Sequence, residues 1–422
     1  MARSSFYNLL LIDSDSDEEL EIVAKLAMEE ESSTSHGRSK KRRTFIRRDR
    51  LQAGLDLFRD YFAEPPIYPH KYFRRRFRMN RVLFHRIQYA VEAYDSYFVQ
   101  KRYGSKRLGF SSLQKITAAL RMLAYGVTAD FMDEYLKIGE ATVIESLKRF
   151  VQAVISIFSE EYLRSPNNKD IARLLAEGES RGFPGMLGSI DCMHWKWKNC
   201  PASWQGMYSG HIHEPTVILE AVASYDLWIW HAFFGLPGSH NDINVLERSF
   251  IFSDLAQGRA PLVNYTVNGH NYNMGYYLAD GIYPQWATFV KTISSPQGNK
   301  RKYFATAQES ARKDVERAFG VLQARFAIIR RPARFWELET LKDIMMACVI
   351  LHNMIIEDDR TNNEAEDFEY EQLNEPPEPV TPGATNEFSE FIRRHHCIRD
   401  RETHSQLQLD LVEHLWQLHS EA

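Results

Sequence analysis

The segment from Gly182 to Phe335 constrains the fold most, because its apolar residues change several times between strand and helix patterns. Leu187 to Lys198 reads as a strand with two different faces. The run VILEAVASYDLWIWHAFFG predicts two strands joined at Tyr225-Asp226, and the second is apolar on both faces, as a central strand would be. A short helix should begin near Asn241. This order predicts an α/β fold with a mixed sheet.

Four carboxylates, each in a sharp local pattern, lie within this segment. They are Asp191 in GSIDCMHWKWK, Asp242 in PGSHNDINVL, Asp280 in YYLADGIYP and Glu316 in ARKDVERAFGVLQARF. We expect Asp191 on the first strand, Asp280 at a later strand end and Glu316 on a long helix packed against the sheet. Acidic side chains are rarely placed in apolar strands unless something pairs with them.

Several converging carboxylates form a cluster of the hard oxygen ligands that Mg²⁺ and Mn²⁺ prefer. Two such ions, about 4 Å apart, can activate a water on one side of a phosphodiester and stabilise the leaving oxygen on the other. The four carboxylates therefore favour a nuclease or DNA-strand-transfer centre.

The two carboxylates expected on or beside strands also have ordinary structural interpretations. Asp191 could be a strand residue that pairs with Lys196 or His194. Asp280 precedes Gly281 at a strand-to-turn junction, where aspartate often serves only to cap a turn. Both alternatives stay open at the level of the sequence.

The carboxylates expected on helices have alternatives too. Glu316 could be a surface partner of Arg312, four residues before it. Asp242 could be a helix-start residue that accepts backbone N–H bonds. We interpret His352, in ILHNMI, as a satisfied core histidine. Packing or DNA contact, rather than metal binding, is the interpretation for His194, His240, Trp195 and Trp197.

Composition indicates an intracellular protein of more than one module. The chain has 422 residues, a length that suggests two or three domains at roughly 150 residues each. Its net charge of −4 excludes a uniformly basic nucleic-acid coat. No apolar run approaches the ~20 residues of a membrane span, and no secretory signal is visible. The four cysteines form no C-x-x-C pair, so we expect neither a disulfide framework nor a zinc ribbon; they are Cys192, Cys200, Cys348 and Cys397.

Residues 1–70 are interpreted as a disordered arm, acidic and then basic. Ile12 to Glu31 is acidic and rich in serine, which argues for disorder. Arg38 to Arg50 (RSKKRRTFIRRDR) is basic, and Lys71 to Arg78 is a second basic cluster. Such clusters are typical of nuclear import or phosphate binding, although a solvated charge run is the alternative.

Residues 71–180 are expected to form an all-helical domain, because apolar residues recur at steps of three and four. Within it, GVTADFMDEYLKIGEATVIESLKRF resembles a helix-turn-helix. The first helix should end near Leu136, Gly139 should break the chain, and the second helix should begin near Ala141 or Thr142. A plain helical bundle fits the same pattern.

After the α/β segment, assigned to residues 181–357, the chain turns acidic and rich in proline. Residues 358–388 are interpreted as a linker. Residues 389–422 should hold a short amphipathic helix with Leu411, Leu415 and Leu418 in register. This helix could dock on its own catalytic domain, pair two protomers or bind a partner.

Long, ordered segments from about Phe73 to the end resemble transposases of the PIF/Harbinger superfamily, specifically the plant Pong-like group. The matching segments are DEYLKIGEAT, RGFPGMLGSIDCMHWKW, ILEAVASYDLWIWHAFFG, GSHNDINVL, YYLADGIYP, ARKDVERAFGVLQARF, ACVILHNMIIED and LVEHLWQL. The resemblance implies a ribonuclease-H-like DDE catalytic domain. It places the catalytic residues at Asp191, Asp280 and Glu316, with Asp242 as a further metal ligand and Mg²⁺ or Mn²⁺ as the cofactor.

The resemblance also implies a function and partners. Such a protein would cut double-stranded DNA at terminal inverted repeats and join the ends to an A/T-rich target. It would act in the nucleus with a Myb-like DNA-binding partner, staying in the cytoplasm without it, and would form a homo-oligomer on DNA. The alternative is a domesticated, transposase-derived nuclear protein that binds chromatin or DNA without cutting.

Overall fold

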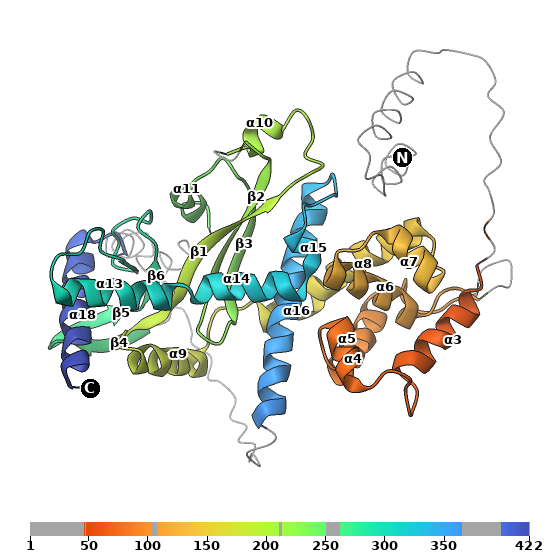
Figure 1. Ribbon diagram of the computed structural model, residues 1–422, viewed down its shortest axis with the longest axis horizontal. Coiled ribbons are helices and arrows are strands. Elements are labelled where there is room, and N and C mark those ends of the chain that lie inside the picture. The colour runs from red at the N-terminus through yellow and green to blue at the C-terminus, as the bar shows by residue number, and fades with distance from the viewer. Residues whose placement is uncertain are drawn as a thin grey trace, which may run out of the picture. The chain divides into compact units, whose positions relative to one another are not determined.

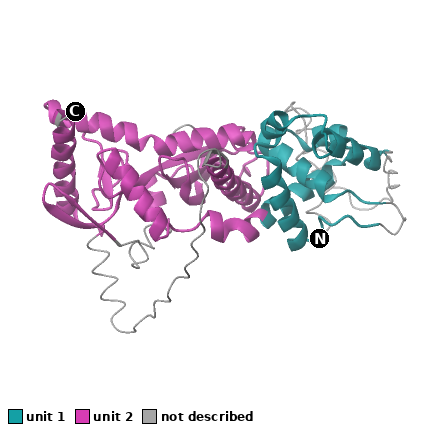
Figure 2. Cartoon of the chain, turned by 90° about the horizontal axis from the view of Figure 1, so that it is seen from below, with its two compact units in different colours: residues 1–153 teal, residues 154–422 magenta. Residues whose placement is uncertain are grey.

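The computed structural model describes residues 46, 48–102, 108–210, 213–249, 262–364 and 398–421. The chain divides into two compact units, residues 1–153 and 154–422, which Figure 2 colours separately. The division falls inside α8 (Glu140–Tyr162). The acidic arm, most of the Arg38–Arg50 cluster and most of the linker at 358–388 lie outside the described residues.

The helices of the first unit begin at side-chain caps. Asn80 accepts a hydrogen bond from the backbone N–H of Leu83 at 2.8 Å and so starts α5. Ser111 and Gln114 form a capping box at the start of α6. Thr128 caps α7. The helices that lie wholly in this unit are α3 (Arg50–Tyr61), α4 (His70–Phe77), α5 (Arg81–Tyr94), α6 (Ser112–Tyr125) and α7 (Ala129–Leu136).

The segment predicted to be a helix-turn-helix forms two helices. α7 ends at Leu136, as predicted, and α8 begins at Glu140, close to the predicted start. The turn uses Lys137, whose φ of 56° is left-handed, rather than Gly139 alone. The local break is therefore as the sequence indicates, and a role in DNA reading stays a prediction.

A five-stranded mixed sheet forms the centre of the second unit (Figure 1), in the order β3-β2-β1-β6-β7. β2 is antiparallel to both of its neighbours, whereas β1, β6 and β7 run parallel to one another. This arrangement is consistent with the ribonuclease-H-like fold expected from the sequence. The strands are β1 (Met186–Lys196), β2 (Thr216–Ala223), β3 (Ile229–Pro237), β6 (Tyr276–Ala279) and β7 (Phe289–Lys291).

Helices pack against this sheet, as predicted. α9 and α14 contact β1, α13 contacts β1 and β6, and α16 contacts β3. The predicted pair of strands on either side of Tyr225-Asp226 is confirmed, as is the short helix after Asn241. The helices are α9 (Asn168–Ser180), α10 (Gln205–Tyr208), α11 (Asp242–Leu246), α13 (Asn299–Arg312), α14 (Asp314–Arg325), α15 (Ala327–Arg330) and α16 (Leu338–Glu364).

The prediction of one long helix around Glu316 is wrong, because two helices meet at Lys313. At the junction, the hydroxyl of Ser189 on β1 donates to the carbonyl of Ala311 at 3.0 Å. Asp314, which begins α14, is 2% exposed and is paired with two arginines. The first contact fixes the end of α13, and the ion pairs of Asp314 fix the start of α14. Because each helix end has its own contacts, the helix is interrupted at Lys313.

The C-terminal helix α18 (Arg401–Glu421) docks on its own unit, against α13, β7 and the hairpin of β4 (Leu262–Val267) and β5 (His270–Met274). Leu411 and Leu415 are buried in this contact, as the apolar stripe predicts, whereas Leu418 is 42% exposed. The buried Asp410 accepts a hydrogen bond from the hydroxyl of Tyr272 at 2.5 Å. Of the three roles left open by the sequence, docking on the same chain is the one observed.

Candidate metal centre

Asp191 lies on β1, the central strand of the sheet, with its side chain 18% exposed. Its pKa is raised to about 6, mainly by burial and to a smaller extent by the charges of Asp242 and Asp280. The backbone N–H of Cys192, 2.8 Å away, and the guanidinium of Arg312 oppose this rise in pKa. Asp191 is thus a largely buried carboxylate whose charge is only partly compensated.

Asp280 follows β6, the strand next to β1. Ser189 and Leu278 are register partners in this parallel pair. Asp191, two residues further along β1, and Asp280, just past the end of β6, therefore lie near each other, and their charges interact. The topology thus brings together two aspartates that are far apart in the sequence.

A turn and one glutamine fix the position of Asp280. Its Oδ1 accepts a hydrogen bond from the N–H of Ile282 at 2.9 Å, so Asp280 does cap a turn. Gln308 on α13 donates to the carbonyls of Ala279 and Val290, each at 3.0 Å, and so ties the ends of β6 and β7 together. The turn contact orients the carboxylate and is compatible with a ligand role.

Asp242 lies near these two aspartates, at the start of α11. Asp242 is the first residue of α11, as the helix-start interpretation has it, but the side chain that accepts the capping bond, from the N–H of Asn244 at 2.9 Å, is that of Asn241. Burial raises the pKa of Asp242, as do the charges of Asp280 and Glu220, while a hydrogen bond with Cys192 lowers it. Asp242 therefore interacts electrostatically with the predicted site.

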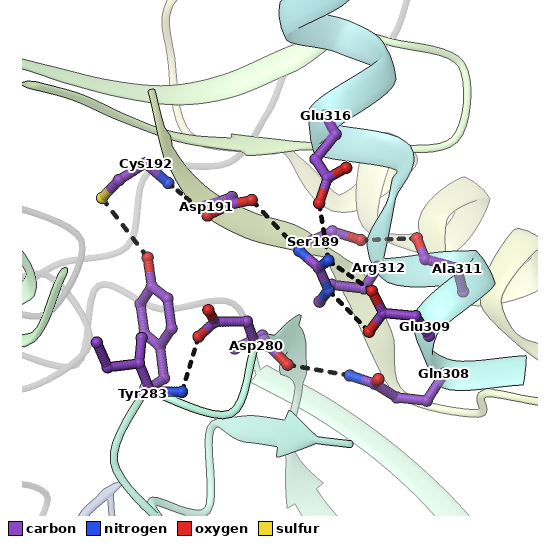
Figure 3. Close-up of polar contacts among 12 residues, drawn as sticks. Ser189, Asp191, Cys192, Asp280, Tyr283, Gln308, Glu309, Ala311, Arg312 and Glu316 are labelled. Carbon is purple, nitrogen blue, oxygen red and sulfur yellow. Dashed lines mark hydrogen bonds and ion pairs between the residues drawn. The ribbon is translucent and has the colours of Figure 1, made fainter. Parts of the chain in front are cut away.

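Glu316 forms an ion pair with Arg312, the partner expected if Glu316 were an ordinary surface residue. Arg312 Nη2 lies 2.7 Å from Glu316 Oε1 and 2.7 Å from Glu309 Oε1. Its Nη1 lies 3.3 Å from Asp191 Oδ2. Figure 3 shows this guanidinium between the three carboxylates. Asp191 is thus paired with Arg312, whereas Lys196 pairs with Glu214.

Among the described residues, no group of three or more His, Cys, Asp or Glu side chains is arranged to hold a metal ion. The donor set nevertheless fits a hard divalent cation, because Asp191, Asp242 and Asp280 supply only oxygen ligands. The charges of Asp242 and Asp280 raise the pKa of Asp191, and that of Asp280 raises the pKa of Asp242. A bound cation would relieve this repulsion. Glu316 would join such a site only after leaving Arg312.

The sequence reasoning missed Glu220, which lies on β2 opposite Cys192 and is fully buried. Its Oε1 is 3.2 Å from His231 Nε2, which also lies 2.9 Å from the hydroxyl of Ser249. The second oxygen, Oε2, has no hydrogen-bond partner in the described part of the chain. An acidic residue inside the apolar run VILEAVA was the signal that could have found it.

The residues interpreted as packing groups have structural contacts. Trp195 and Trp197 donate their indole N–H groups to the carbonyls of Arg331 and Phe335, each at 2.8 Å. His352 is fully buried; its Nε2 lies 2.9 Å from the carbonyl oxygen of Leu227, and its Nδ1 lies 3.1 Å from Arg325 Nη1. The interpretation of His352 as a satisfied core histidine is confirmed. The described residues include no helix long and apolar enough to cross a membrane.

The mixed sheet, with Asp191, Asp242 and Asp280 close enough to interact electrostatically, is consistent with a transposase-like fold, and the chain is similar to known plant transposon proteins. Residues 160–363 match the family model described as plant transposon protein. Residues 55–92 match a second model, described as a domain of unknown function. The first of these matches agrees with the resemblance to PIF/Harbinger transposases that the sequence motifs indicate.

Two proteins from Arabidopsis thaliana are similar to this chain. The chain is 25% identical over 275 residues to the protein named ALP1-like, an alignment that covers 61% of this chain and 65% of the relative. It is 22% identical over 247 residues to Antagonist of Like Heterochromatin Protein 1, with 58% and 62% coverage. The chain thus spans less than two thirds of the length of these curated relatives. No solved structure matches it.

Proposed function

We propose that this chain is a metal-dependent DNA endonuclease and transposase with a ribonuclease-H-like catalytic domain. The observation that carries the proposal is the register of β1 and β6, which brings Asp191 and Asp280 near each other. The raised pKa of Asp191 supports it, because carboxylates that crowd one another favour a shared cation.

Each carboxylate would bind the metal ions from a different element of the fold. Asp191 and Asp280 would hold Mg²⁺ or Mn²⁺ from the rigid sheet, and Asp242 would add a ligand from the start of α11. Glu316, which is 43% exposed, would complete the set when Arg312 releases it. When bound, the metal ions would neutralise the phosphodiester and activate the attacking water. The freed 3′-hydroxyl of the element would then attack target DNA in the same site.

The test is an excision assay in which a reporter carries the terminal inverted repeats found beside the gene. Asp191→Asn and Asp280→Asn keep the side-chain size but remove a charged ligand, so excision should fall by orders of magnitude. Asp130→Asn, at an exposed position of α7, is the matched control and should excise normally. Normal excision by either site variant would rule out the metal scheme.

We further propose that tight binding to the element ends needs a Myb-like partner that acts with this chain in the nucleus. The net charge of −4 leaves this chain little general affinity for DNA. The partner would read base edges, while Arg38 to Arg50 would contact phosphates. A titration of the ends at near-physiological salt, with each protein alone and with both, tests this division. Nanomolar, sequence-specific binding by this chain alone would refute it.

A chromatin-associated protein that does not cut DNA is the second candidate function. One relative is named as the antagonist of a heterochromatin-like protein, which favours this candidate. The ion pair of Arg312 with Glu316 also suits it, because the guanidinium balances carboxylates without a metal. Excision activity that depends on Asp191 would exclude this reading, and co-purification with chromatin proteins without excision would support it.

A further inference from the structure

A pocket of about 280 Å³ lies in the first unit, lined by residues of α3, α4, α6 and α7. Its volume is near the lower limit for ligand sites, so it suits one side chain or chain end rather than a large cofactor. Two arginines and four tyrosines dominate the lining: Arg76, Arg121, Tyr61, Tyr68, Tyr125 and Tyr135.

Arg121, on α6, is a buried arginine in this pocket. It is only 7% exposed, yet its Nε has no hydrogen-bond partner among the residues that the structure describes. Its Nη2 donates to the hydroxyl of Tyr61 at 3.3 Å, and its guanidinium lies 4.6 Å from the ring centre of Phe77. Aromatic faces stabilise a guanidinium in part, but no described carboxylate forms an ion pair with this buried charge.

Arg76, on α4, approaches the same phenol from a second helix. Its Nη1 also donates to the hydroxyl of Tyr61, and its guanidinium lies 4.1 Å from the ring centre of Tyr68. Within the described part of the chain, no carboxylate forms an ion pair with Arg76 or Arg121. Both guanidinium groups therefore hydrogen-bond to one neutral acceptor, while Asp60, in the same pocket, interacts electrostatically with Arg76 without forming an ion pair. A planar anion between the two arginines would stabilise this arrangement.

We propose that this pocket binds a carboxylate carried by a peptide segment of a protein partner. The planar fork of a guanidinium matches a carboxylate, and the tyrosine rings would contact the apolar part of the residue that carries it. A buried guanidinium such as Arg121 cannot reach the convex backbone of a DNA duplex, whose phosphates are normally met by exposed lysines and arginines.

The charge around the pocket also favours a peptide over nucleic acid. Asp60 lines this pocket, and Asp49, Asp56 and Asp60 all line a neighbouring one of about 170 Å³. An acidic border repels a polyanion but attracts a peptide in which a lysine or arginine stands near the carboxylate. The partner segment should therefore combine one acidic group, an adjacent apolar residue and a basic residue.

The experiment uses the full chain and fluorescence anisotropy with three short labelled peptides that share a phenylalanine and a lysine. One has an internal glutamate, one has glutamine in its place, and one ends in a free α-carboxylate. At least one carboxylate peptide should bind at least about tenfold more tightly than the glutamine peptide, because charged hydrogen bonds are lost. Comparing the two carboxylate peptides shows whether the pocket binds a glutamate side chain or a C-terminal carboxylate.

Substitutions in the pocket test whether its two arginines bind the peptide. Arg76→Gln should weaken binding of the carboxylate peptide at least about tenfold, whereas Arg75→Gln, at the exposed neighbouring position of α4, should not. Arg121→Gln should act like Arg76→Gln; Arg121→Lys, checked by circular dichroism, serves if the glutamine variant does not fold. Asp191→Asn should bind like the wild type, so the result is independent of the proposed nuclease centre.

Two results would overturn the proposal. Binding of both carboxylate peptides no tighter than that of the glutamine peptide, or unchanged binding by Arg76→Gln, would exclude a carboxylate site. Duplex DNA binding that is lost in Arg76→Gln but kept in Arg75→Gln would assign the pocket to nucleic acid instead.

Discussion

Arg312 and Glu316 form an ion pair at 2.7 Å, one helical turn apart across the junction of α13 and α14. The same guanidinium lies 3.3 Å from Asp191, so one cation balances two of the three residues proposed to be catalytic. Glu309 is its third carboxylate partner, and the hydrogen bonds to Glu309 are the first cause of the raised pKa of Arg312. A metal ion that uses Asp191 and Glu316 must therefore compete with Arg312.

This competition predicts the behaviour of Arg312→Ala. In EDTA the variant should be less stable to urea by about 1–3 kcal/mol, because charged hydrogen bonds are lost. Added Mn²⁺ should then stabilise the variant more than the wild type, since binding no longer displaces a guanidinium. Arg301→Ala, at an exposed position of α13, is the control. Equal stabilisation of wild type and variant by Mn²⁺ would contradict the competition.

Asp191→Asn should stabilise the metal-free protein at neutral pH. The pKa of Asp191 is raised to about 6, so the folded state holds this proton more tightly than the unfolded chain does. Above pH 6 the charged carboxylate therefore destabilises the fold, on the order of 3 kcal/mol, a figure that already contains the opposing effect of Arg312. Urea unfolding at pH 7.5 in EDTA measures the difference. A loss of stability, with Asp130→Asn unchanged, would show that the ion pair outweighs the cost of burial.

Because His352 is buried and neutral, we expect the free energy of unfolding to fall at acidic pH. The pKa of His352 is lowered to about 3, first by burial and second by the charge of Arg325, so the folded state excludes a proton that the unfolded chain binds near pH 6.5. The stability from His352 is therefore complete above pH 6.5 and is lost as the pH falls towards 3, at about 1.4 kcal/mol per pH unit. His352→Gln should remove this part of the slope. Unfolding curves at several pH values check it, and identical slopes would refute the neutral, buried state.

The docking of α18 gives a matched pair of leucine variants. Leu411 is fully buried and Leu409 is 54% exposed on the same helix. Leu411→Ala should lower stability by about 2–5 kcal/mol, because it leaves a cavity, whereas Leu409→Ala should change it little. Amide exchange of α18 should rise in the first variant alone. Similar protection of α18 in both variants would mean that the observed contact does not hold the helix.

Local patterns in the sequence determined most elements of the α/β unit. Alternating apolar residues located β1, the VILEAVASYDLWIWHAFFG run located β2 and β3, and Asn241 marked the start of α11. These patterns work because a strand or helix displays its burial along the chain with a fixed period. The carboxylates stood out for a related reason, since an acidic residue in an apolar run needs a partner.

Tertiary structure alone decided which distant residues meet. The register of β1 with β6 sets Asp191 beside Asp280, and nothing local to either residue specifies that register. The contact of Ser189 with Ala311 accompanies a break between α13 and α14 that the apolar stripe conceals. Arg312 is placed between three carboxylates by the same packing, and the face of α18 that could have met any apolar surface meets α13 and β7. Sequence periodicity fixes each element and its buried face, whereas long-range contacts, which depend on how all the elements pack together, fix the geometry of the site.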